Sequence, residues 1–435
     1  MNALRKYYRN TFSSLKIRNY RLYFIGQGIS LSGTWMQSIG QAWLVLNLTG
    51  SGTALGLVTA LQFLPVLVLA SWGGVIADRF PKRRLLFATQ AAAGLLALTL
   101  AILVFSGAIR LWMVYILAAS LGVVNSIDNP IRQSFVLELV GRKKLRNAVT
   151  LNSTEINLTR VIGPAIAGFI ITGLGLAPCF FINAASYIAV LVCLFLMNAG
   201  EFHLMKRARS TKGQLRRGFS YVRHTPLLRD VLVMMALIGT LCYEFQVSLP
   251  LLARFTFSSN AGGYALLTSA IGIGAVLGGL LRAGKRSTAP RGLIGAAFAF
   301  GVTMLLAAIS PDLPVALTAM VLVGAASISF TSLSNAVLQL GSAPEMRGRI
   351  MALWAMAFLG STPIGGPIIG LIGEHGNPRW TLAAGAAAAI IAGTYGLLSM
   401  KRHPDAYSRD LVEPAAAPSE EMSAPEVSAP ASSPS

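Results

Sequence analysis

Long apolar runs separated by short polar segments dominate the chain. Each run is long enough to cross a bilayer as a helix, since about 20 residues suffice. A polar gap at 200–228 divides the runs into two sets. The first set occupies 22–47, 53–77, 85–107, 111–128, 148–173 and 177–199, and the second occupies 230–252, 262–281, 291–310, 313–340, 350–373 and 379–400. The pattern predicts an all-α membrane protein with twelve transmembrane helices in two six-helix bundles.

The same pattern predicts the division of the chain. Two runs, 22–47 and 313–340, exceed the thickness of a bilayer and are expected to tilt. The end of the chain is rich in Ala, Pro, Ser and Glu without periodicity, which is typical of disorder. We expect a cytoplasmic N-terminal segment at 1–21, bundles at 22–199 and 229–400, a cytoplasmic central loop at 200–228, and a disordered cytoplasmic tail at 401–435.

The two halves of the chain resemble each other. Three landmarks recur at an offset of about 203 residues: 163–168 with 366–370, Arg146 with Arg349, and 73–76 with 278–281. Because each half has an even number of helices, the repeats are expected to run parallel about an axis along the membrane normal. Two such bundles can rock about a central site, as in a transporter.

Charge indicates the orientation. Only 12% of residues are charged, about half of what a soluble protein carries, and Lys and Arg outnumber Asp and Glu 36 to 16. Basic residues cluster between apolar runs, which argues against nucleic-acid binding. By alternating sides, 32 of the 36 fall on one side and three, Arg110, Arg254 and Arg379, on the other. The positive-inside rule therefore predicts that both termini are cytoplasmic.

A glycine and charge motif follows the second run. Its chemistry suggests close packing of the glycines on the helix at 350–373, with an ion-pair lock that holds one conformation and releases in the other. The alternative, an ordinary topogenic loop, explains the cations but not the order of residues. The candidate lock residues are Gly73, Gly74, Asp78, Arg79, Lys82 and Arg83.

The fifth predicted helix carries Gly163, Pro164 and Gly168. Proline removes one helical hydrogen bond and glycine permits close contact, so the helix can bend where the bundles meet. Since the motif recurs at 366–370 in the run at 350–373, we favour a gating role. Simple helix packing is the alternative, because Gly and Pro are common in membrane helices.

Three charges fall inside apolar runs, where each costs roughly 2.5–3.5 kcal/mol. Arg160 shares a helix face with Asn157, and Glu155 lies five residues away, about 140° round the helix, too far for a tight pair. We expect Arg160 to bind an anionic substrate group or a carboxylate, and Glu155 or Glu244 to take a proton. Alternatively, Glu155 snorkels to the surface and Glu244 lies near the outer helix end.

Two further polar pairs lie on the first and fourth predicted helices. Gln37 and Gln41 lie one turn apart on the first helix and are expected to line the cavity. Asp128 and Arg132 close the fourth helix and are expected to pair structurally or to join the lock. Cys179, Cys193 and Cys242 lack metal-binding spacing, so we expect no metal.

The motif after the second run resembles the signature loop of the major facilitator superfamily, with Pro81 and Lys82 where Gly and Arg are frequent. Residues 37–46, 129–135 and 157–164 are similar to the drug–proton antiporter branch that includes the enterobactin exporter and macrolide exporters. The resemblance covers about 12–400. The Gly163-Pro164 pair is similar to a motif of the superfamily's antiporters. Residues 118–122 lack an Arg that many such antiporters have.

The resemblance implies a secondary transporter, a monomer in the bacterial inner membrane, that exports an amphiphilic small molecule such as a drug, siderophore or secondary metabolite. Alternating access would be coupled to protons, with no cofactor. The alternative on the same fold is a proton-coupled importer. No nucleotide-binding motif is present, so ATP is not the direct energy source. An enzyme or receptor would need a catalytic cluster or soluble domain, which we do not find.

Overall fold

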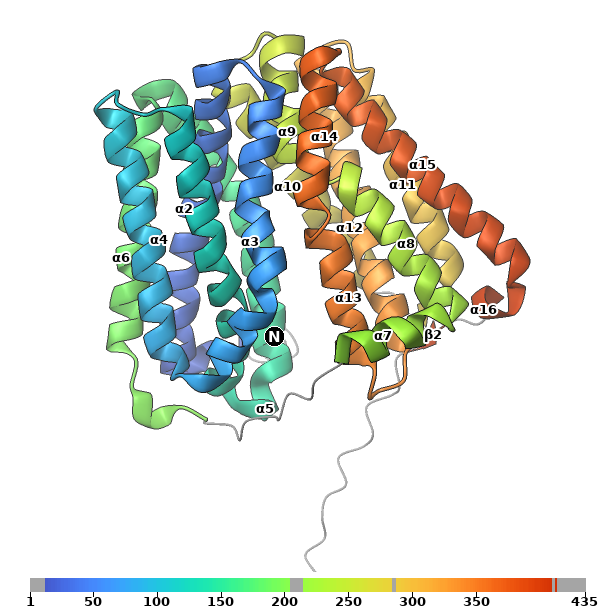
Figure 1. The fold of residues 1–435 in the computed structure, drawn as a ribbon. Coiled ribbons are helices and arrows are strands. Elements are labelled where there is room, and N and C mark those ends of the chain that lie inside the picture. Colours follow the sequence, from blue (N-terminus) through green and yellow to red (C-terminus); the bar gives the residue numbers. More distant parts are fainter. Residues whose placement is uncertain (1–11, 204–213, 284–286, 409–410, 413–435) are drawn as a thin grey trace, which may run out of the picture.

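The computed structural model describes residues 12–203, 214–283, 287–408 and 411–412. Two bundles of long helices stand side by side (Figure 1). The first bundle contains α2 (Arg18–Thr49), α3 (Gly52–Arg79), α4 (Lys82–Phe105), α5 (Leu111–Leu174) and α6 (Leu176–Leu196). The second contains α8 (Pro226–Leu241), α9 (Phe245–Leu251), η3 (Leu252–Thr256), α10 (Ala261–Ala283), α11 (Pro290–Ala308), α12 (Leu313–Leu340), α13 (Arg347–Leu359), α14 (Thr362–His375) and α15 (Arg379–Arg402).

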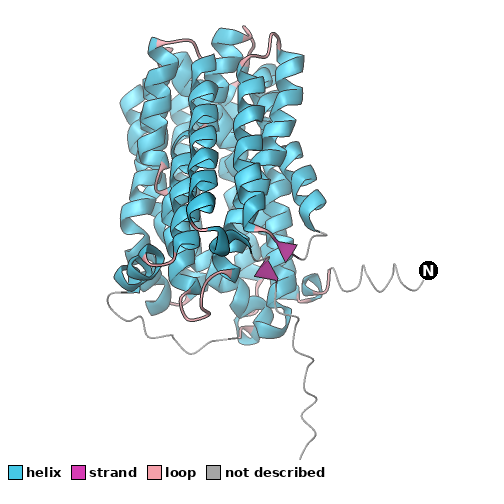
Figure 2. Ribbon diagram, turned by 90° about the vertical axis from the view of Figure 1, so that its right-hand side faces the viewer, coloured by secondary structure: helices cyan, strands magenta, loops and turns pink. Residues whose placement is uncertain are grey.

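Short elements gather at one end of the molecule (Figure 1). They are η1 (Ser14–Lys16), η2 (Ala199–Glu201), α7 (Gln214–Arg223), α16 (Pro404–Ser408) and the antiparallel pair β1 (Ser287–Thr288) and β2 (Leu411–Val412). Figure 2 shows the two strands beside the helix ends on this side. We call this end the basic face. The opposite end, with the turns at Gly50, Gly107 and Gly175, is the far face.

Twelve crossings account for the described helices. Ten stretches are long and apolar enough to span a membrane. One of these, α5, crosses twice, and the more polar α2 adds another crossing of 32 residues. The predicted all-α membrane fold is therefore confirmed.

The predicted ends of the fourth and fifth helices are wrong. The sequence indicated runs at 111–128 and 148–173 with a loop between them, but helix extends from both runs as far as Gly141, whose non-helical conformation (φ 66°, ψ 174°) makes a kink that divides α5 into two helices. Buried Ile131, Phe135 and Leu139 pack beneath the bundle and hold this extension as helix. Hydropathy detects the membrane-spanning length and misses such amphipathic extensions.

Glycine contacts show the repeat in three dimensions. A side chain on Gly73 would collide with Ser126 of α5, and one on Gly278 would collide with Ala325 of α12. The following glycines, Gly74 and Gly279, both face open space. Corresponding helices therefore pack in the same way in each half. The expectation that Gly73 and Gly74 pack on the helix at 350–373 is wrong, because Gly73 packs on α5 within its own bundle.

The first part of the predicted disordered tail is folded, which corrects the assignment of 401–435. Asp230 at the start of α8 is fully buried and accepts hydrogen bonds from Tyr395 (2.9 Å), Ser399 and, on α16, Tyr407 (3.0 Å). Arg229 adds an ion pair at 3.2 Å. A carboxylate with several donors ties α16 to the bundle; residues 413–435 lie outside the described part. Likewise, the predicted central loop contains α7.

We expect Tyr407→Phe to lower the free energy of unfolding by about 1.5–3 kcal/mol, because the mutation removes a hydrogen bond to a buried carboxylate. Thermal unfolding in detergent measures the loss. Tyr115→Phe is the matched control, since no hydrogen bond is described for that half-buried hydroxyl. Equal melting temperatures for the two variants would contradict the anchoring role of α16.

Candidate functional site

A cavity of about 380 Å³ lies between the two bundles. Trp35, Asn157 and Arg160 line it from the first bundle, and Tyr243 and Trp354 line it from the second. Because both halves contribute, a relative movement of the bundles changes the shape of this cavity. Its wall is rich in aromatic side chains, namely Trp35, Phe63, Tyr243, Phe245, Tyr264, Trp354 and Phe358.

A second cavity of about 370 Å³ continues towards the basic face. It shares Trp35, Ser38, Phe63 and Gln246 with the first. Arg132 of α5 lines its other end. The two cavities therefore form one path from the centre of the molecule towards the basic face, which we call the central cavity.

Arg160 is the central charge of this cavity. Its guanidinium carbon lies 5.2 Å from the ring centroid of Trp35, a cation–π distance. Its Nε is buried without a hydrogen-bond partner, and the described residues provide it with no ion pair. Asn157 lines the same cavity, as helical spacing predicted. An unpaired guanidinium on an aromatic face is a ready partner for a carboxylate or another planar anion.

Arg132 is held by its neighbours. It pairs with Asp128 and donates to Gln27 Oε1 at 2.6 Å. Asp128 also accepts from Thr89 (2.6 Å) and Gln90 (2.9 Å), so the carboxylate is fully used. These contacts fit the expectation that Asp128 and Arg132 form a structural pair.

Electrostatics favours an anionic ligand. None of the residues that line the two parts of the central cavity is Asp or Glu within the described structure, whereas Arg160 and Arg132 both line it. The aromatic wall is packed: the rings of Tyr243 and Phe358 meet edge to face with their centroids 5.0 Å apart, and the Tyr243 hydroxyl donates to Ser327 O at 2.9 Å. The cavity therefore suits an anion with flat apolar parts.

The bundles are sealed together at the far face. Gly52 and Gly56 of α3 lie so close to Gly366 and Gly370 of α14 that a side chain on either α3 glycine would collide with α14 backbone atoms. Glu374 completes the contact by accepting hydrogen bonds from Ser51 Oγ (2.6 Å) and the Thr53 amide (2.8 Å). Nearby, Arg254 of η3 donates to Leu46 O and Asn47 Oδ1 of α2, a further contact between the bundles, while Gly52, Gly56, Gly366, Gly370 and Glu374 join α3 to α14. We call these α3–α14 contacts the far seal.

We expect Gly56→Ala to weaken the far seal, because the added methyl group would meet the backbone of Gly366 and Pro367. A penalty of about 1.4 kcal/mol on the closed seal shifts the equilibrium between the closed and the open seal tenfold towards the open state. Labelling of a cysteine introduced at Thr59, with a membrane-impermeant maleimide from the far face, measures the opening. Gly74→Ala is the control, since that position faces open space. Equal labelling rates would show that the seal does not limit access.

Glu244 lies behind the cavity wall, next to the far seal. It is 2% exposed and precedes α9, where the seventh crossing breaks between α8 and α9. Its Oε1 has no hydrogen-bond partner, and the carboxylate lies against Gly365 and Gly366 of α14 and beside Thr362. Thr362 lines the central cavity. The carboxylate of Glu244 thus lies between the cavity and the seal.

The other candidate polar residues are elsewhere. Glu155 faces a separate groove on the outside of the first bundle. Gln37 is not part of the central cavity, which corrects that expectation: it accepts a hydrogen bond from Asn183 of α6 at 2.5 Å. Gln41 lines only a small void between α2, α3 and Gln246. Helical spacing correctly indicates that Gln37 and Gln41 share a face of α2. It does not show that Gln37 on this face contacts Asn183 of α6 instead of the cavity.

The candidate lock residues make contacts inside the first bundle. Lys82 pairs with Glu138 at 2.6 Å. Arg83 donates to the carbonyl oxygens of Leu194 and Phe195 at the end of α6, both at 2.9 Å. These cations therefore fasten α4 to α5 and α6. The side chain of Asp78 lies outside the described part, and Arg79 is exposed.

The candidate gating residues of α5 face two different partners. Gly163 lies against Trp35 and Ser32 of α2 in its own bundle, whereas Gly168 lies against Ala265 of α10 in the other bundle. Ser269 of α10 also donates to Val161 O at 3.2 Å. The segment around Pro164 thus touches both bundles.

Sequence reasoning missed the aromatic half of the site. Tyr243 and Trp354 were not singled out, because aromatic residues are common in apolar helices. The signal available was local: Tyr243 precedes the charged Glu244 within an otherwise apolar run. The break between α8 and α9 places Tyr243 at the bundle interface, and α13 places Trp354 there.

Comparison with known proteins gives sequence relatives. Residues 9–432 match a family described as transmembrane secretion effectors. The staphyloferrin A transporter of Staphylococcus aureus is 29% identical over 60% of this chain and 66% of its own length. The MFS-type transporter YfiS of Bacillus subtilis is 26% identical over 46% and 48%. The enterobactin exporter EntS of Escherichia coli is 24% identical over 87% and 91%. The matches thus span less than two thirds of the first two proteins and nine tenths of the third.

Solved structures share the fold. A bacterial homologue of the human lysosomal transporter Spinster aligns with a TM-score of 0.69 over 91% of this chain and 98% of its own, at 15% identity. A bacterial homologue of the iron transporter ferroportin aligns with a TM-score of 0.65 over 88% and 98%, also at 15% identity. At this level of identity the likeness concerns architecture alone.

Proposed function

The chain belongs to the transmembrane secretion effector family of the major facilitator superfamily, and from this premise we propose that it exports an anionic, amphiphilic small molecule in exchange for protons. It is a multi-pass membrane transporter rather than an enzyme. The proposed setting is the bacterial cell membrane, with the basic face and both termini in the cytoplasm and the protein acting as a monomer. The basic residues of the loops support this orientation.

The unpaired Arg160 carries the proposal. A buried guanidinium costs free energy unless an anion accompanies it, and the central cavity provides none of its own. The substrate supplies that partner, while the aromatic wall covers its apolar parts. Enterobactin and staphyloferrin A, the compounds that give two relatives their names, are suitable first probes.

The proton is assigned to Glu244. In the structure the far seal is closed over this carboxylate, which lacks a partner for Oε1. A neutral Glu244 is compatible with the closed seal, whereas a charged one out of water destabilises it. Loss of the proton towards the cytoplasm then opens the far face, and a proton taken up from outside closes it again. This order produces exchange of substrate for protons.

Flux in inside-out vesicles tests the proposed direction. With enterobactin as the probe and an imposed pH gradient, acid inside, we expect accumulation that a protonophore abolishes. Accumulation in intact cells that a protonophore abolishes, with none in inside-out vesicles, would show an importer instead.

A further inference from the structure

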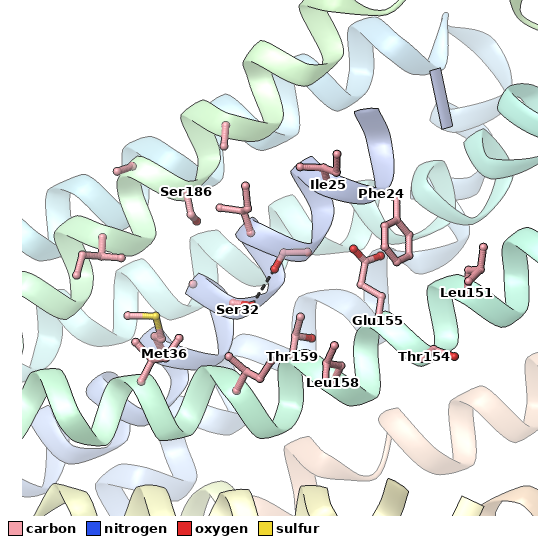
Figure 3. Close-up of a pocket in the computed structure, with 18 of the residues that line it drawn as sticks. Phe24, Ile25, Ser32, Met36, Leu151, Thr154, Glu155, Leu158, Thr159 and Ser186 are labelled. Atoms are coloured by element: carbon pink, nitrogen blue, oxygen red, sulfur yellow. Dashed lines mark hydrogen bonds between the residues drawn. The ribbon is translucent and has the colours of Figure 1, made fainter. Parts of the chain in front are cut away.

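A groove of about 860 Å³ lies on the outside of the first bundle, between α2, α5 and α6 (Figure 3). It shares no lining residue with the central cavity. The two sites use different faces of α2: Gly28 and Ser32 line the groove, while Trp35 and Ser38 line the central cavity. We call it the lateral groove.

Apolar side chains form its walls. Ile25 is 51% exposed, Leu158 53% and Ile182 43%, and each comes from a different helix. In a membrane-spanning bundle such side chains face acyl chains. The lateral groove is therefore wide enough and apolar enough to hold an alkyl chain.

One acid lies in this apolar groove. Glu155 is 5% exposed, and neither of its carboxylate oxygens has a hydrogen-bond partner. Figure 3 shows the carboxylate pointing from α5 towards α2, beside Phe24. A methyl group on Gly28 would lie 2.7 Å from Glu155 Oε1, so the missing side chain of Gly28 makes the space for the carboxylate.

Within the described structure, no Lys or Arg side chain forms an ion pair with Glu155. Arg132 is the nearby guanidinium, and it is bonded to Asp128 and Gln27. A buried carboxylate without a partner is costly, and a ligand with the opposite charge removes that cost. An anion would be repelled, and an alkyl chain alone would leave the acid unpaired.

We propose that the lateral groove binds a lipophilic ammonium ion, with its alkyl chain between α5 and α6 and its ammonium group on Glu155. Gly28 lies ten residues after the start of α2 at Arg18, roughly 15 Å along the helix. A phospholipid headgroup stays at the membrane surface, but a single-chain amine can reach this depth. The site is separate from the proposed central site, which selects the opposite charge.

Photolabelling of the full chain in lipid nanodiscs tests the site. The probe is an alkyltrimethylammonium with a diazirine in its chain, and mass spectrometry locates the labelled peptides. We expect labels on α2, α5 and α6 around Ile25, Leu158 and Ile182. Dodecyltrimethylammonium should compete, and dodecanol and dodecyl sulfate should not. Glu155→Gln should reduce labelling at least about tenfold.

Two further variants separate a specific site from general partition into the membrane. Ile162→Trp fills the lateral groove without changing its charge and should also abolish labelling, whereas Ile188→Trp, on an exposed part of α6 outside the groove, should not. Undiminished labelling of Glu155→Gln, or equal competition by dodecanol, would overturn the proposal. If Glu155→Gln does not fold, undiminished labelling of Ile162→Trp overturns it. Arg160→Ala should keep full labelling, so failure of the proposed export function would remain distinguishable.

Discussion

Replacement of Arg160 with alanine is expected to raise the dissociation constant of an anionic substrate by roughly 30-fold or more. Removing one partner of a buried, hydrogen-bonded charge pair costs about 2–5 kcal/mol, and 2 kcal/mol corresponds to roughly 30-fold. The guanidinium is unpaired in the central cavity and lies over Trp35, so a bound anion would be its partner. Equilibrium binding of radiolabelled enterobactin to purified protein measures the effect.

Two controls show which property of Arg160 matters. Arg160→Lys keeps the charge but loses the planar, two-pronged geometry and the stacking on Trp35, so intermediate affinity is expected. Asn157→Ala changes a neutral side chain on the same wall and should have a much smaller effect. Wild-type affinity in Arg160→Ala would place the substrate elsewhere.

Replacement of Glu244 with glutamine is expected to abolish proton-driven transport while substrate binding is retained. Glutamine copies the neutral acid in size and cannot lose a proton, so the far seal stays closed. An ionised carboxylate at mid-bilayer costs roughly 2.5–3.5 kcal/mol. Ionisation of Glu244 should therefore shift the equilibrium between the closed and the open seal about 70-fold or more towards the open state. Raising the pH should therefore speed labelling of a cysteine at Thr59 from the far face more in the wild type than in Glu244→Gln, where only ionisation of the thiol itself changes the rate.

Glu155→Gln is the matched control for Glu244→Gln. Both acids are buried, and both oxygens of Glu155 and Oε1 of Glu244 lack hydrogen-bond partners, but only Glu244 lies against the far seal. Glu155→Gln should keep the pH dependence of transport. The reverse result, loss of pH dependence in Glu155→Gln alone, would move the proton to Glu155.

The architecture could be predicted from the sequence because the membrane constrains it. A helix that crosses lipid must be apolar over a fixed length, so hydropathy locates each crossing. The duplication was visible in the recurring glycines, and Gly73 and Gly278 indeed occupy equivalent contacts. Because lipid and water differ so strongly in polarity, the positions of the crossings follow from hydropathy and do not depend on how the side chains pack.

Other features depend on contacts between distant helices and could not be predicted. Gln37 turns towards Asn183, which lies 146 residues away, rather than into the cavity. The Tyr407 hydroxyl donates a hydrogen bond to Asp230. This contact orders α16, although the composition of the tail is typical of disorder. Helical spacing puts Arg160 and Glu155 on different faces of one helix, but the cavity that each face lines follows from the packing of α5 against its neighbours. Their charge inside apolar runs indicates that both residues are important, but it does not show which groups each side chain contacts.

Proton movement driven by substrate tests the account most directly. Purified protein is placed in liposomes with a trapped pH dye, and enterobactin is added on the side of the basic face without any initial pH gradient. We predict that protons move towards the side from which enterobactin is taken up, opposite to the substrate, and that Arg160→Ala and Glu244→Gln show no such movement. Proton movement in the same direction as the substrate, or substrate transport without any proton movement, would contradict the account.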